Sequence, residues 1–110
     1  MENLVVSLAT AKKLKKSGWA HETFFYWSRY LYDGTMEVAA PGNEDALFVC
    51  YAPTAEEIAD QLPSHIYMEK RGKRYSARNL EPDLIGKAQT AGTLAEALAR
   101  LWLAVEGEAA

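Results

Sequence analysis

The sequence has few of the residues that bind metals, form disulfides or carry out catalysis. It contains one cysteine, Cys50, and two histidines, His21 and His65. A single cysteine cannot form an internal disulfide, and these three residues lack the clustered spacing of zinc ligands. The seven glycines are scattered singly, so no phosphate-binding loop or nucleophile elbow is present. We therefore predict no catalytic residue, no metal ligand and no cofactor, hence a protein that is not an enzyme.

Long apolar segments are also missing. The apolar runs fall far short of the roughly 18 residues that a membrane span needs, and the N-terminus lacks the basic-then-apolar order of a signal peptide. We expect a cytoplasmic protein without a membrane association. The net charge of −3 disfavours general binding to nucleic acid, which relies on Lys and Arg. A length of 110 residues with 49% hydrophobic residues predicts one globular domain over residues 1–110.

Two short segments carry the signals of helix ends. "VSLATAKKLKKSGW" begins at a candidate N-cap, Ser7, and ends at Gly18, which suits the position after a helix. "PTAEEIADQLP" has Thr54 and Glu57 at the spacing of a capping box, and Pro63 ends the helix. Both segments predict short helices with one apolar face.

The C-terminal segment "TLAEALARLWLAVEGE" is the most regular in the chain. Thr93 and Glu96 have the spacing of a second capping box. Apolar residues follow at helical spacing, and we expect the helix to pack on the sheet through Leu94, Leu98, Leu101, Trp102 and Val105.

The remaining segments predict strands. Residues 23–32, followed by a turn at Asp33-Gly34, and "ALFVCYA", after a loop at "APGNED", are rich in β-forming residues. "HIYMEKRGKRYSARNL" alternates as a hairpin with Arg71-Gly72 at its turn, and a further short strand is predicted over 85–89. The predicted order is α-β-β-α-β-β-(β)-α, which is an α+β domain with an antiparallel sheet covered by helices.

The stretch "FFYWSRYLY" concentrates aromatic residues, since it holds six of the twelve in the chain. Strand alternation puts rings on both of its faces. Such a strand either is covered on both sides or has one face in the core and the other in an interface. If one face lies open, the candidate contact residues are Trp19, Tyr26, Trp27 and Tyr30.

Positive charge is concentrated in two places. Four lysines of the first predicted helix and five cations of the predicted hairpin make up nine of the twelve positive charges. The hairpin cations are Lys70, Arg71, Lys73, Arg74 and Arg78. They suit a solvated hairpin that discourages pairing between strand edges. They equally suit a site for phosphate, an acidic protein or an anionic ligand.

Two resemblances add to this interpretation. The order "VSLATAKKLKKSGW", "FFYW", "APTAEEIADQLP", "TLAEALARLWL" resembles small uncharacterised proteins encoded by bacteriophages and prophages. This resemblance implies a bacterial cytoplasm and an accessory role. Residues 74–99 are similar to the strand-strand-helix core of HicB-like antitoxins, although Ile85 stands where a proline usually precedes Gly86.

The sequence thus favours a non-enzymatic accessory binding protein that acts through protein contacts, as a homo-oligomer. The alternatives are a binder of a small anionic or nucleotide-type ligand through the basic hairpin, and a HicB-like regulator.

Overall fold

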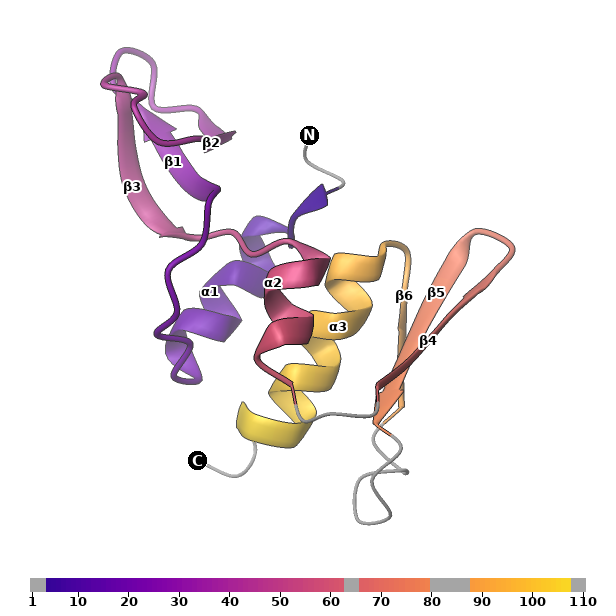
Figure 1. Ribbon diagram of the computed structural model, residues 1–110. Helices are drawn as coiled ribbons and strands as arrows, with labels where there is room; N and C mark the ends of the chain where they lie inside the picture. The colour runs from indigo at the N-terminus through magenta and orange to yellow at the C-terminus, as the bar shows by residue number, and fades with distance from the viewer. Residues whose placement is uncertain (1–3, 63–65, 80–87, 108–110) are drawn as a thin grey trace.

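The computed structural model describes residues 4–62, 66–79 and 88–107. These residues form helices and antiparallel strands, which confirms the predicted α+β class (Figure 1). In chain order the elements are α1 (Leu8–Lys16), β1 (Tyr26–Tyr30), β2 (Met36–Ala39), β3 (Ala46–Tyr51), α2 (Ala55–Asp60), β4 (Ile66–Arg71), β5 (Arg74–Asn79), β6 (Gln89–Ala91), α3 (Leu94–Trp102) and a final π-helical segment, Leu103–Gly107.

The strands form two separate three-stranded sheets, in the orders β2-β1-β3 and β4-β5-β6. The sheet β2-β1-β3 projects from the body of the molecule, whereas β4-β5-β6 lies beside α3 (Figure 1). The molecule measures 49 × 33 × 19 Å with a radius of gyration of 14.4 Å. A compact domain of this length has a radius of gyration of about 13 Å. The larger value here reflects the projecting sheet, which makes the molecule elongated.

The predicted strands are present, but their first and last residues differ from the prediction. The strand predicted over 23–32 is shortened to β1, and β2 follows it as a strand that the sequence did not predict. The turn between them contains Gly34 at φ 73°, and Asp33 Oδ1 accepts from the backbone N–H (2.9 Å) and hydroxyl (2.8 Å) of Thr35. These bonds lower the pKa of Asp33. The last strand begins at Gln89, and residues 85–87 of its predicted range lie outside the described residues.

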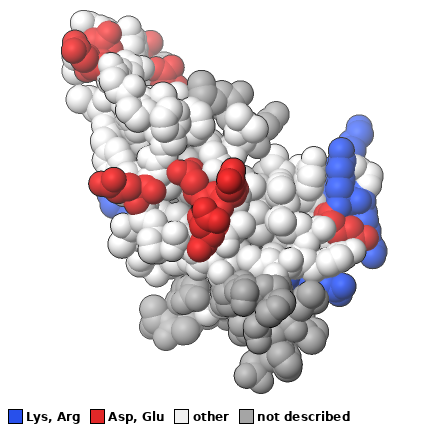
Figure 2. Space-filling model, in the orientation of Figure 1, with Lys and Arg blue, Asp and Glu red and all other residues white. Residues whose placement is uncertain are grey.

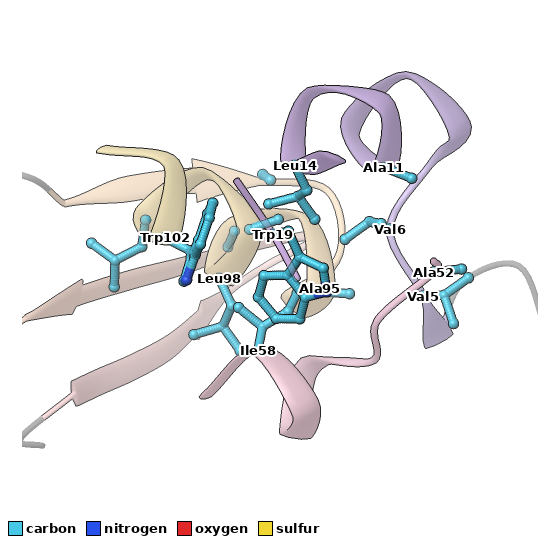
Figure 3. Close-up of a cluster of buried hydrophobic side chains, with 14 of the residues drawn as sticks. Val5, Val6, Ala11, Leu14, Trp19, Ala52, Ile58, Ala95, Leu98 and Trp102 are labelled. Carbon is cyan, nitrogen blue, oxygen red and sulfur yellow. The ribbon is translucent and has the colours of Figure 1, made fainter. Parts of the chain in front are cut away.

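The core forms where the three helices and the sheet β4-β5-β6 meet (Figure 3). Leu14 of α1, Ile58 of α2 and Leu98 of α3 are all fully buried. Trp102 of α3 meets Trp19 edge to face, with ring centroids 5.2 Å apart. α3 is buried on more than one side, because its small residues Ala95, Ala97 and Ala99 let neighbouring elements approach closely.

The capping residues of α1 and α2 are those that the sequence predicts, and the α2 cap also contacts the segment before β1. Ser7 caps α1, and Thr54 and Glu57 form the predicted capping box of α2. The second carboxylate oxygen of Glu57 also accepts from Phe24 N at 2.9 Å, which anchors the chain that leads into β1.

At α3 only half of the predicted capping box forms. The Thr93 hydroxyl accepts from Glu96 N, as predicted. The Glu96 carboxylate, however, bonds to the first turn of α1, where it accepts from Ser7 N and from the Thr10 hydroxyl, the latter at 2.6 Å. A tertiary contact therefore takes the place of the local one, because the N-terminus of α1 offers unpaired N–H groups to this carboxylate.

Candidate partner-binding surfaces

Two of the predicted contact residues, Trp19 and Trp27, lie in the core. Trp19 is 6% exposed and Trp27 is 8% exposed. Their indole N–H groups donate to backbone oxygens at 2.9 Å, Trp19 to His21 and Trp27 to Val6. Both indoles therefore pack the interior and have their polar group satisfied, which leaves little of either ring for a partner.

Tyr26 and Tyr30, in contrast, lie on one face of the projecting sheet together with rings from β3. The register pairs Tyr26 with Tyr51 and Ser28 with Phe48, so all these side chains share a face. The ring of Phe48 lies 5.7 Å from that of Tyr26 and 5.0 Å from that of Tyr51. We call Tyr26, Tyr30, Phe48 and Tyr51 the aromatic face.

The aromatic face continues into exposed apolar residues at the outer end of the sheet. Tyr32 is 73% exposed and its ring lies 5.5 Å from that of Tyr30. Leu31 and Phe48 are each more than half exposed. Scattered apolar residues are ordinary on a surface, but neighbouring rings on a projecting element are typical of a contact site.

The basic hairpin, β4 and β5, separates its cations onto two faces. Register places Arg71, Arg74 and Arg78 on the open face, while Ala77 of the opposite face is buried against α3. On the open face, the Arg78 guanidinium lies 4.7 Å from the centre of the Tyr67 ring, and Arg71 Nε contacts Glu69 Oε1 at 2.7 Å.

The other two hairpin cations lie elsewhere. Lys70 is on the helix-covered face of the sheet, 5.6 Å from the Tyr75 ring centre, and Lys73 is exposed at the turn beside Gly72. The structure therefore places three of the five predicted cations on one face, with Arg71 and Arg74 paired near the turn and Arg78 farther along β5.

The two ends of the molecule carry opposite charge. Figure 2 shows basic side chains over β4 and β5, and acidic side chains at the outer end of the projecting sheet. Exposed acidic residues there include Asp33, Glu37 and Glu44. The basic hairpin and the acidic end are complementary in sign, although they point away from one another within one molecule (Figures 1 and 2).

Two adjoining hollows, which the sequence did not predict, lie between α1 and β3. The smaller, of about 120 Å³, is lined by Ala11, Lys15, Trp19, Phe48, Cys50 and Tyr51. The more open one, of about 430 Å³, is lined by Lys12, Lys15, Lys16, Val49 and Cys50. Lys15 belongs to both and donates from Nζ to Val49 O at 3.3 Å, which joins the helix to the strand. Three of the four α1 lysines therefore surround one opening.

Cys50 is the buried core residue that its apolar strand predicts, with 1% exposure. Burial raises the pKa of its thiol, and the positive charges of Lys15 and Lys12 oppose this shift only in part. The thiol is therefore protonated at neutral pH.

We expect Cys50 in the folded protein to react with iodoacetamide at pH 8 slower than a free cysteine peptide by about a hundredfold, because the pKa of its thiol is raised and the residue is only 1% exposed. Mass spectrometry of the alkylated protein over time measures the rate. The urea-unfolded protein is the control and should react at the peptide's rate. Rapid alkylation of the folded protein would show that Cys50 is accessible.

Within residues 4–62, 66–79 and 88–107, no group of three or more Cys, His, Asp or Glu side chains could hold a metal ion. Among the described helices, none has the length and apolar character to cross a membrane. No protein-family model matches the chain, and no curated protein or solved structure is significantly similar to it. The resemblances to phage-encoded proteins and to HicB-like antitoxins therefore stay predictions.

Proposed function

We propose that the protein is a non-enzymatic accessory binding protein of phage or prophage type, which acts in the bacterial cytoplasm through protein contacts. The observation that carries this proposal is the aromatic face on the projecting sheet. Its rings lie beside the highly exposed Tyr32 at the outer end of an element that extends from the body. Tyrosine and other aromatic residues supply much of the binding energy at protein interfaces, because each buries a large area with few rotatable bonds.

A second copy of the chain is a partner with the required charge. The basic hairpin of one copy is complementary to the acidic end of the projecting sheet of another (Figure 2). Such a contact joins different surfaces of the two copies and therefore builds rings or open chains. Because both surfaces are exposed, salt would weaken the contact. This supports the homo-oligomer that we propose.

The aromatic face is tested with the double variant Tyr30→Asp, Tyr32→Asp. We expect it to lower affinity for the partner about tenfold or more, because carboxylates replace rings in an apolar contact. Affinity is measured after a pull-down from bacterial lysate has identified a stoichiometric partner, and self-association is measured by light scattering at low and high salt.

Leu4→Asp is the matched control, since Leu4 is 61% exposed but lies outside the projecting sheet. This variant should bind as the parent does. The proposal fails if neither a stoichiometric partner nor self-association is found, or if the double variant binds as well as the control.

The alternative is an anionic or nucleotide-type ligand bound by the basic hairpin. It is favoured by Arg71, Arg74 and Arg78 on one open face, with Tyr67 beside Arg78, since guanidinium groups bind phosphate and rings stack on bases.

The double variant Arg71→Glu, Arg74→Glu tests the hairpin. Both positions are exposed, so we expect the thermal midpoint to stay nearly unchanged. Loss of phosphate or nucleotide binding, measured by calorimetry, would support the alternative. Loss of self-association alone would support contacts between copies, and unchanged binding of every kind would remove the hairpin from both hypotheses.

A further inference from the structure

We propose that the two hollows between α1 and β3 form one binding site for a small aromatic anion of the benzoate class. This site is distinct from the basic hairpin, and it shares Phe48 and Tyr51, but not Tyr30 or Tyr32, with the aromatic face. The smaller hollow would hold the ring, and the lysines around the larger one would hold the anionic group.

The smaller hollow has the chemistry and size of a ring-binding cavity. Trp19, Phe48 and Tyr51 line it with aromatic rings, and Ala11 and Cys50 complete an apolar wall. Its volume is about 120 Å³. An apolar protein cavity of ~150 Å³ is known to bind benzene, so this hollow suits one ring in a partly open setting, with offset or edge-to-face contacts.

The lysines supply the anion's partner. Lys12 and Lys16 are four residues apart and Lys15 lies between them, so the three ammonium groups share one side of α1. Among the described residues, neither Lys12 nor Lys16 has an ion-pair partner. Like charges at this spacing destabilise a helix, and a bound anion would relieve that repulsion. The charges of Lys12 and Lys15 also reach Cys50, which lines both hollows.

The two features together define the ligand class. An anion without an apolar group would meet only exposed ammonium groups, whose attraction is screened by water and salt. A neutral ring would fill the smaller hollow without using the lysines. An aromatic carboxylate uses both, so its affinity should exceed that of either fragment.

The experiment is a titration of the ¹⁵N-labelled protein, followed by amide NMR shifts at low ionic strength, with benzoate, benzamide and acetate. Benzamide keeps the ring and shape but has no charge, and acetate keeps the charge but has no ring. We expect benzoate to shift amides of α1 and β3 and to bind about tenfold or more tightly than either other compound. Equal affinities for benzoate and benzamide, equal affinities for benzoate and acetate, or shifts that lie elsewhere would overturn the proposal.

Substitutions of the lysines test whether they bind the carboxylate of benzoate. The double variant Lys12→Gln, Lys16→Gln should weaken benzoate binding about tenfold, because two of the three charges at the opening are lost while exposed positions tolerate glutamine. Lys13→Gln is the control on the same helix, since Lys13 lines neither hollow. Equal effects of the two variants would show a diffuse charge effect and refute the site. The Tyr30→Asp, Tyr32→Asp variant should still bind benzoate, because neither tyrosine lines a hollow, so a failure of this site can be distinguished from a failure of the proposed protein contacts.

Discussion

Replacing Trp102 with alanine is expected to lower the free energy of unfolding by about 3–5 kcal/mol. The side chain is 6% exposed and lies in the cluster where α3 meets α1 and α2. Its ring contacts Trp19 edge to face at 5.2 Å, so truncation removes both buried area and an aromatic pair. Because a packed core relaxes only in part around a truncated side chain, the surroundings should fill the space incompletely.

The measurement is urea unfolding followed by far-UV circular dichroism, because the substitution removes one of the three tryptophans that fluorescence would report. Tyr67→Ala is the control, since Tyr67 is 42% exposed on the open face of the basic hairpin. It should change stability by less than about 1 kcal/mol, as surface substitutions usually do. A Trp102→Ala effect no larger than that of the control would mean that α3 does not pack as described.

The helices could be predicted from the sequence because their signals are local. Ser7, Thr54 and Thr93 each accept the backbone N–H that their position predicts. Capping and apolar spacing act within a few residues, so a single sequence carries them almost complete.

The strands and their pairing could not be predicted from the sequence as accurately as the helices. β2 is four residues long, and its apolar side chains are the half-buried Met36 and Val38 and the small buried Ala39, so its strand state depends on pairing with β1. The register between β1 and β3 shifts at Trp27 and Ser28. Such a bulge breaks simple alternation, and partners from other strands decide it.

The candidate surfaces were likewise predicted only where the signal lies within one segment of the chain. The sequence grouped Tyr26 and Tyr30 with Trp19 and Trp27 as candidate contact residues, although both tryptophans are buried, because burial depends on what covers each face. Phe48 and Tyr51 joined the aromatic face through the β1–β3 register. The hollows beside α1 could not be predicted from the sequence, because they form between residues far apart in the chain, such as Lys15 and Val49, that contact one another only after folding.

Glu96 is the residue at which a local prediction gives way to a tertiary contact, and its replacement by alanine is expected to cost about 1–3 kcal/mol. The carboxylate of α3 accepts from Ser7 N and from the Thr10 hydroxyl, and it lies at the N-terminus of α1, where negative charge is favoured. Its loss would leave the part-buried Thr10 hydroxyl without this acceptor and loosen the packing of α1 against α3.

A double-mutant cycle with Thr10→Val distinguishes this contact from the intrinsic effect of Glu96 in its own helix. If the hydrogen bond joins the helices, the two substitutions should be non-additive by about 0.5–2 kcal/mol in urea unfolding, because each alone removes the same bond. Glu44→Ala, in the exposed loop before β3, is the charge-matched control and should change stability by less than about 1 kcal/mol. Strict additivity would assign the cost of Glu96→Ala to α3 alone. A coupling in the expected range would show that the carboxylate is held away from its own helix cap because it bonds to α1.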